Sequence, residues 1–185
     1  MDTTPLSAYK ARPGQSMERH LDGVARLGGR PIRGAGPRAS GDERDEVMQA
    51  VEWVHDIGKL TEYFQSYIET SDRTAAGRTE LTYHGTFGGL VASLALAERG
   101  LSPEATAAGF YAVTKHHSVF GNFYEEVDDY YVPNKERVDD TYELASRQLA
   151  SIDETAPEAA DVVLRKATDG AYGWDELADS GFDRA

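Results

Sequence analysis

Residues 51–60 read VEWVHDIGKL and place His55, Asp56 and Lys59 inside a stretch whose other residues are mostly apolar. A helix advances about 100° per residue, so the three polar side chains can converge on one region of its surface. Burying such groups is costly unless a partner compensates, and a metal ion accepts a neutral imidazole and a carboxylate together. The stretch therefore predicts a helix that carries a polar, metal-binding face into the interior.

Composition limits what kind of protein this is. The chain has 185 residues, 40% of them hydrophobic, which predicts one domain over residues 1–185 with a proper core. It has no cysteine, so a metal ion would be held by imidazole and carboxylate groups. The first residues lack the basic and apolar regions of a signal peptide, and no run approaches the roughly 18 apolar residues of a membrane span. We expect a cytoplasmic protein with no membrane partner.

The charge is strongly acidic, because 32 acidic residues oppose 19 basic ones and give a formal net charge of −13. Such a chain repels nucleic acid at long range. The lysines are few (Lys10, Lys59, Lys115, Lys135 and Lys166), and an acidic, lysine-poor surface is typical of proteins that work in concentrated salt. At molar salt the Debye length falls to about 3 Å, so the net charge would exclude no partner. An acidic surface that maintains solubility in an ordinary cytoplasm is the alternative.

Capping residues and Gly/Pro-rich breaks predict an all-α fold. The expected helices cover about 17–27, 42–59, 61–69, 84–97, 103–117, 136–152 and 157–168. In the first, Met17, His20, Val24 and Leu27 form one stripe. A Gly/Pro-rich loop is expected over about 28–43, another loop over 70–81, and an irregular aromatic and acidic segment over about 118–135.

The five histidines all lie in or at the ends of these helices: His20, His55, His84, His116 and His117. A lone histidine on an apolar face is usually a hydrogen-bonded core residue, and a pair at a helix end can be cations that satisfy the helix dipole. The joint pattern favours a site, because helical hairpins would bring the four helix faces to a common centre. Five imidazoles and the Asp56 carboxylate suffice for two metal ions about 3.5–4 Å apart, an arrangement that activates water for attack on phosphorus.

The stretches PGQSMERHLDGV, VEWVHDIGKL, TEYFQSYI, YHGTFGGLVA and TKHHS carry a family resemblance. Their order of His, His-Asp, His and His-His resembles the HD phosphohydrolase superfamily. The flanking residues look like the HD nuclease domain of the CRISPR-associated type I helicase-nuclease, over roughly residues 9–125. The most specific motifs are HDIGK, followed by an aromatic-rich segment, and the paired histidines of KHH, which follow a helix rich in small residues. The resemblance implies an HD-domain helical bundle with the metal site at its centre.

The resemblance implies a metal-dependent endonuclease that degrades single-stranded DNA in antiviral defence, after the crRNA-guided surveillance complex Cascade has opened the target. The implied ligands are His20, His55 and Asp56 for one metal ion and Asp56, His84, His116 and His117 for a second. Asp56 and Lys59 are the implied catalytic residues, with Lys59 facing the phosphate. A helicase domain or subunit is the implied partner. No Walker-type phosphate-binding motif occurs in this sequence, so the helicase would be separate or lie outside it.

In this family, an aspartate on a C-terminal helix completes the ligand set of the first metal position. The candidates here are Asp161, Asp169, Asp175 and Asp179, or a residue beyond Ala185. The fragment ELADSG favours Asp179, although its helix is short and its apolar stripe weak. Many imidazoles and few carboxylates favour Mn, Ni, Co, Fe or Zn over Mg. Because histidine ligands must be neutral, occupancy should fall below about pH 6.

Substrate contacts are unknown at this level. A single-strand channel uses arginines and stacking aromatics, and the candidates are Arg30, Arg33, Arg38, Phe120, Phe123, Tyr124, Tyr130 and Tyr131, with Ser118 and Asn122 near the groove. A packed flap that contacts no ligand explains the aromatic segment equally well, and Asp128 and Asp129 argue against phosphate contact there. Two other functions stay open: an HD phosphohydrolase of nucleotides or cyclic nucleotides, and a non-catalytic, metal-stabilised docking domain for a helicase or surveillance complex.

Overall fold

The computed structural model describes residues 5–28, 41–72, 74, 79–118 and 135–182. Over these residues the fold is all-α, as predicted, apart from a short ribbon in which Lys10 pairs with Ser16 and Arg12 with Gln15. The elements are η1 Pro5–Ala8, β1 Lys10–Arg12, β2 Gln15–Ser16, α1 Met17–Gly28, α2 Gly41–Val54, η2 Ile57–Leu60, α3 Glu62–Thr70, η4 Thr79–Thr82, α4 Gly85–Glu98, α5 Pro103–Lys115, α7 Lys135–Thr155, α8 Pro157–Ala167 and α9 Trp174–Ser180.

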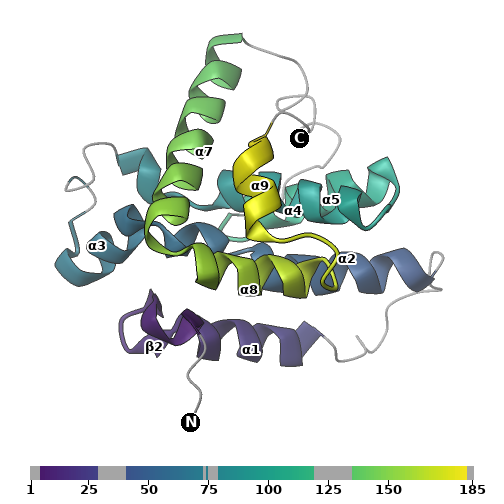
Figure 1. The fold of residues 1–185 in the computed structure, drawn as a ribbon, viewed down its shortest axis with the longest axis horizontal. Coiled ribbons are helices and arrows are strands. Elements are labelled where there is room, and N and C mark those ends of the chain that lie inside the picture. Colours follow the sequence, from purple (N-terminus) through teal and green to yellow (C-terminus); the bar gives the residue numbers. More distant parts are fainter. Residues whose placement is uncertain (1–4, 29–40, 73, 75–78, 119–134, 183–185) are drawn as a thin grey trace.

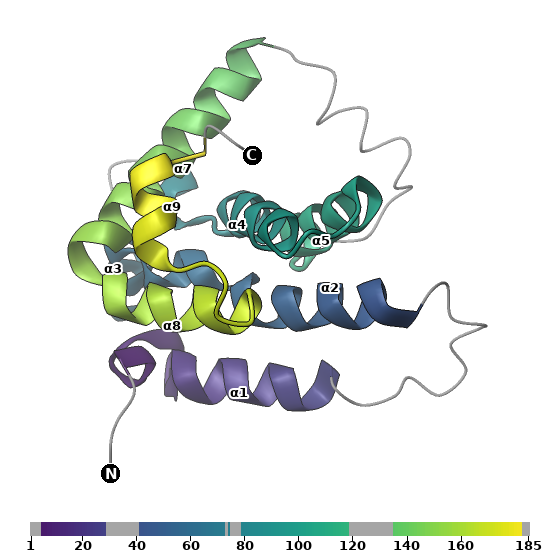
Figure 2. The ribbon, with the colours of Figure 1, turned by 45° about the vertical axis from the view of Figure 1, so that its right-hand side comes forward.

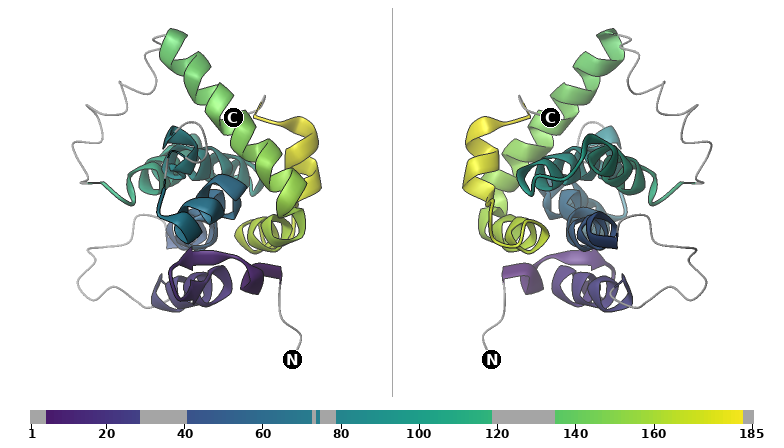
Figure 3. Two further views of the ribbon diagram at one scale, coloured as in Figure 1. Left: turned by 90° about the vertical axis from the view of Figure 1, so that its left-hand side faces the viewer. Right: turned by 90° about the vertical axis from the view of Figure 1, so that its right-hand side faces the viewer.

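Helix α2 lies at the centre of the bundle and contacts α1, α4, α5 and α8 (Figure 1). Helices α4 and α5 lie side by side and cover it on one side, while α1 covers it on the other (Figure 2). Figure 3 shows α1 and the N-terminal ribbon at one end of the molecule and the start of α7 at the other. This arrangement brings the C-terminal end of α2 between α1 and the α4–α5 pair.

The helix boundaries follow local capping chemistry. The Thr61 hydroxyl accepts a hydrogen bond from the Phe64 backbone N–H at the start of α3, and the Ser102 hydroxyl accepts one from Ala105 at the start of α5. Pro103 follows Ser102 at the first helical position, where its missing N–H costs nothing. Gly100 ends the α4 segment with a φ of 74°, a conformation that glycine adopts without strain.

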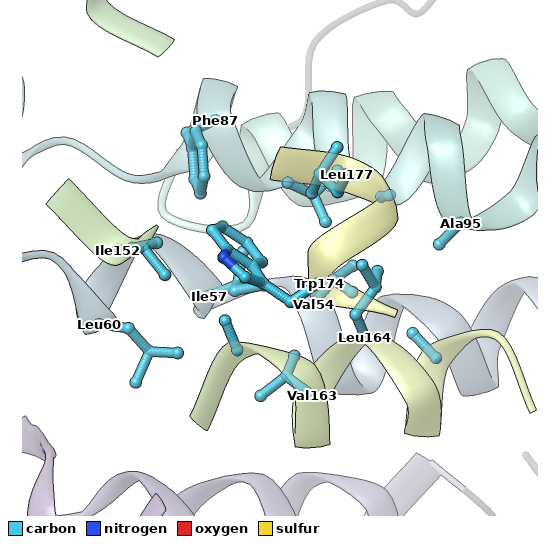
Figure 4. Close-up of a cluster of buried hydrophobic side chains, with 14 of the residues drawn as sticks. Val54, Ile57, Leu60, Phe87, Ala95, Ile152, Val163, Leu164, Trp174 and Leu177 are labelled. Carbon is cyan, nitrogen blue, oxygen red and sulfur yellow. The ribbon is translucent and has the colours of Figure 1, made fainter. Parts of the chain in front are cut away.

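The core gathers around Trp174 of α9, which is fully buried together with Leu177 one turn on (Figure 4). Its indole N–H donates to the Asp153 carboxylate at 3.1 Å, so the one polar atom of the ring is satisfied. Val54, Ile57 and Phe87 pack on the same cluster. The expectation of a weak apolar stripe at this helix was therefore wrong: α9 is short, but its two large apolar residues lie at the centre of the core.

Two further expectations need correction. Helix α2 ends at Val54 rather than Lys59, and His55 and Asp56 occupy a turn before the 3₁₀ helix η2. On α1 the buried residues are Met17 and Leu21, whereas Leu27 is 64% exposed, because the end of the helix faces α2 through Gly28, which lies against Glu52.

Several expectations fall largely outside the described residues. Of the predicted loop over 28–43, residues 29–40 lie outside the description, and so do residues 119–134 of the aromatic and acidic segment with all its candidate aromatics and Asn122. The three candidate arginines of the loop lie there too. Among the helices the structure describes, none has the length and apolar character needed to cross a lipid bilayer. The expectation of a single domain stays a prediction.

Candidate metal centre

The structure brings all five histidines together around Asp56. His20 comes from α1, and His55 and Asp56 come from the turn after α2. His84 directly precedes α4, and His116 and His117 lie in the turn after α5, which ends at Lys115 and not at His117 as expected. Their ligand atoms form two groups in which all atoms lie within 4.8 Å of one another. The groups are His20, His55 and Asp56, and Asp56, His84, His116 and His117. These are the residues the sequence singled out, in the same two sets.

The two oxygens of the Asp56 carboxylate face different groups. Oδ2 lies 2.7 Å from Nε2 of His20 and 3.4 Å from Nε2 of His55. Oδ1 lies 3.0 Å from Nε2 of His84 and 3.3 Å from Nε2 of His116, with His117 at 4.0 Å. Asp56 itself is 1% exposed. One buried carboxylate therefore joins the two groups, and each oxygen serves one of them.

Backbone carbonyls fix which nitrogen of two rings faces the centre. Nδ1 of His55 lies 3.0 Å from the carbonyl oxygen of Glu52, and Nδ1 of His116 bonds the carbonyl of Val113. A carbonyl only accepts, so in each ring Nδ1 carries the proton, and in the neutral ring Nε2 presents a lone pair. This is how metal-binding histidines are usually oriented. The sequence analysis missed these two orienting groups, although each lies three residues before its histidine.

The Nε2 atoms of two pairs of rings lie in close contact. Nε2 of His20 and Nε2 of His55 are 3.2 Å apart, and Nε2 of His84 and Nε2 of His117 are 3.0 Å apart. Two acceptor atoms at such distances need a proton or a cation between them. Imidazole nitrogens around a shared, buried carboxylate also match the ligand preferences of divalent transition metals. These groups could hold a metal ion, and the donor set fits one.

The pKa values of the site reflect burial and mutual contact. Burial alone would raise the pKa of the Asp56 carboxyl, but the ring nitrogens of His116, His20, His55 and His84 donate hydrogen bonds to it wherever they carry a proton, and these hold its pKa well below the usual range.

Two of the histidines change in the direction that favours metal binding. Burial lowers the pKa of His84, and burial together with the neighbouring imidazoles lowers the pKa of His117 to about 4. Both rings are therefore neutral at pH 7, and that of His117 stays neutral well below the pH 6 limit expected from ordinary histidine values.

Lys59 lies inside the centre. Its ammonium is 2.8 Å from Oδ2 of Asp56 and 5.5 Å from the centroid of the Phe64 ring, and the residue is 8% exposed. It is therefore a buried cation in contact with the shared carboxylate, and not a solvated lysine at a helix end. The expectation that it faces a phosphate stays a prediction.

The late aspartates take other roles. The Asp161 carboxylate accepts from Arg165 at 2.8 Å and from the backbone N–H of Trp174 at 2.9 Å. Asp169 has a φ of 54° in the turn after α8, and Asp175 and Asp179 are exposed on α9. Among the described residues none of these four belongs to either group, because α8 and α9 turn toward the core around Trp174 instead of the centre.

A pocket of about 520 Å³ opens beside the second group. His84, His117 and Lys59 line it, together with the aromatic residues Phe64, Tyr67 and Tyr83. The sequence analysis did not assign these aromatics. Their signal was present, since Tyr83 directly precedes His84 and the other two follow HDIGKL within one helix.

The fold and the site define an all-α protein with a buried histidine and aspartate centre that could hold a metal ion. Comparison with known protein families, with curated proteins and with solved structures found no match to this chain. Its function must therefore be argued from the geometry of the centre and from the sequence motifs that form it.

Proposed function

We propose that this chain is a metal-dependent HD-type endonuclease that hydrolyses phosphodiester bonds of single-stranded DNA in type I CRISPR interference. The observation that carries the proposal is the position of Asp56, whose two oxygens each face a separate group of histidine nitrogens. The order of these residues along the chain supports it, because it is that of the HD nuclease domain which the sequence resembles.

Two metal positions follow from the two groups. His20, His55 and Asp56 would hold one ion, and Asp56, His84, His116 and His117 the other. The five imidazoles favour Mn, Ni, Co, Fe or Zn over Mg. Divalent ions held there supply Lewis acidity, which polarises a phosphoryl oxygen and makes water a usable nucleophile at neutral pH.

The protein's own residues hold and balance the charge. Lys59 would neutralise negative charge that develops on the phosphate, since its ammonium lies at the centre and in the wall of the adjoining pocket. The Glu52 and Val113 carbonyls hold two of the rings in one tautomer. In the reaction a water oxygen bonds to phosphorus, the bond from phosphorus to one ester oxygen breaks, and a proton goes to the leaving oxygen.

The partners follow from the same proposal. The chain would act in the cytoplasm on DNA that Cascade has opened, together with a helicase domain or subunit.

Cleavage of circular single-stranded DNA tests the proposal, because only an endonuclease can nick a circle. Protein loaded with Mn²⁺, Ni²⁺ or Co²⁺ should convert circles to linear strands and then to fragments. Asp56→Asn should lose this activity by at least about 10²-fold, since it removes the charge that both metal positions share. The matched control is Asp179→Asn, an exposed aspartate outside both groups, which should keep full activity.

The competing functions give different results. An enzyme for small substrates would hydrolyse cyclic nucleotides or bis(p-nitrophenyl) phosphate and leave the circle intact. A docking domain would bind its helicase equally well as wild type and as Asp56→Asn, and would hydrolyse neither substrate with any metal. Either result would overturn the nuclease assignment.

A further inference from the structure

The pocket beside the second histidine group has the size of a ligand site. Its volume of about 520 Å³ falls within the range of roughly 300–1,000 Å³ that small-molecule sites occupy. His84 and His117 belong both to its wall and to the candidate metal centre, so the pocket opens directly onto the place where a phosphate would react. Whatever fills it is held next to that phosphate.

The wall favours an aromatic ligand. The Phe64 ring lies edge-on to His84 with centroids 5.3 Å apart, and Tyr67 lies edge-on to Phe64 at 5.9 Å. Tyr83 lines the pocket and is 57% exposed, so its side chain is accessible to a ligand. Stacking on such rings is how proteins hold the bases of single strands without reading their sequence.

The Tyr83 backbone is fixed in place. The buried amide of Gln148 donates to the carbonyl oxygens of Tyr83, at 2.7 Å, and of Leu81, at 3.1 Å. Gln148 is 3% exposed and belongs to α7. The segment that carries the ring is therefore tied to the bundle, which lowers the cost of ordering it when a ligand binds.

The charge of the wall favours an anion. The chain carries a net charge of −13, yet none of the described residues that line this pocket is acidic, and Lys59 is among them. Gly85 and Thr86, from the first turn of α4, also line it, and the N-terminal end of a helix favours negative charge. By contrast, a smaller pocket of about 150 Å³, which Tyr83 and Thr86 also line, has Glu80 in its wall.

We propose that this pocket holds the nucleotide next to the scissile phosphate, with its base stacked on Tyr83 and its phosphate directed toward His84, His117 and Lys59. The inference rests on the proposed function, and it identifies Tyr83 as a positioning residue for DNA. It explains why the aromatic wall lies beside the second histidine group: a base held there places the adjoining phosphate at the centre.

Binding of two small probes tests the base contact without relying on turnover. Calorimetric titration of Mn²⁺-loaded protein with thymidine 5′-monophosphate and with 2-deoxyribose 5-phosphate compares ligands that differ only by the base. Wild type should bind the nucleotide about 5- to 150-fold more tightly, the range expected for stacking of one base. Tyr83→Ala should bring the ratio close to one, and Tyr83→Phe should preserve it because the ring remains.

Tyr142→Ala is the matched control. Tyr142 is 40% exposed on α7 and does not line the pocket, so the same truncation there should leave the ratio unchanged. With circular single-stranded DNA, Tyr83→Ala should raise KM by a similar factor and change kcat less.

The outcomes separate this inference from the nuclease assignment. A wild-type ratio near one, or an unchanged ratio in Tyr83→Ala, would overturn the base pocket even if the circle is cleaved. A ratio that depends on Tyr83 in a protein that leaves the circle intact would support the pocket and overturn the assignment to DNA.

Discussion

Asp56 is the residue on which both halves of the centre depend. Oδ2 faces His20, His55 and Lys59, while Oδ1 faces the histidines of α4 and α5. A buried carboxylate with so many partners is stabilised as the anion, which is why its pKa lies far below the usual range although burial acts against this. Removing its charge therefore affects both groups, whereas removing one histidine affects one.

Metal stoichiometry should reveal this division. We expect wild type to retain two Mn²⁺ or Ni²⁺ ions per chain after dialysis, as measured by elemental mass spectrometry. His20→Ala should retain about one, because it leaves two ligands in the first group and all four in the second. Asp56→Asn should retain fewer than one, since the shared ligand is weakened for both positions.

Asp179→Asn again provides the control. A histidine variant cannot serve as the control, because all five histidines of the chain belong to the centre. Equal loss of both ions in His20→Ala would show that the two groups form a single site. If wild-type protein bound no divalent ion, the proposal of a metal centre would be wrong.

The break between α2 and η2 is what places Asp56 at the centre. Gly58 lies in η2, and a β-carbon added there would come within 2.6 Å of Cβ of His84 and 3.2 Å of its Cα. The absence of a side chain thus lets η2 approach the start of α4 closely. Similarly, a β-carbon on Gly88 would lie 3.1 Å from the backbone oxygen of His55. Two glycines therefore bring the segments that carry His55, Asp56 and His84 into contact.

Gly58→Ala should damage both stability and metal binding. The added methyl group must push His84 and the start of α4 away, at a cost of about 1–3 kcal/mol in the free energy of unfolding. The displaced ring should also weaken metal binding at the second group. Chemical denaturation and a competitive metal titration measure the two effects on the same variant.

Gly23→Ala separates the steric effect from a general effect of removing glycine. Gly23 lies in α1 with nothing within 4 Å of an added β-carbon, so alanine should stabilise the helix by up to about 1 kcal/mol. If Gly58→Ala were as stable as wild type and bound metal equally well, close packing at this point would not hold the centre together.

The same elements show what the sequence could and could not predict. Helix α5 was predictable because Ser102 and Pro103 mark its start locally, and the histidines were predictable as a group because each lies at or near a helix end. The end of α2 at Val54 was not, because apolar residues continue through HDIGKL and the close approach of α4 at this point involves residues distant in sequence. The burial of Trp174 was not predictable either, since its partners lie in distant helices.

The net charge of −13 affects the molecule as one object. Like charges spread over a compact surface repel one another, and this lowers the stability of the folded state. The repulsion also opposes the approach of DNA, which is itself an anion. Both effects act over distances that salt shortens, from about 10 Å at 0.1 M to about 3 Å at 1 M. The proposed nuclease would therefore be suited to concentrated salt, where the charge of its surface no longer repels DNA.

Stability should therefore rise with salt. We expect the Tm measured by circular dichroism at pH 7 to increase steadily as KCl is raised from about 0.1 M to about 1 M, because screening removes repulsion that the unfolded chain largely escapes. Near the sequence pI of about 4.7 the net charge vanishes, so the same titration should change Tm much less. A Tm that stays constant or falls with KCl at pH 7 would mean that acidic and basic groups are paired so evenly that net charge has no effect on the fold. In that case the acidic composition would be explained by solubility in an ordinary cytoplasm. At that lower salt concentration the negative surface would still repel DNA.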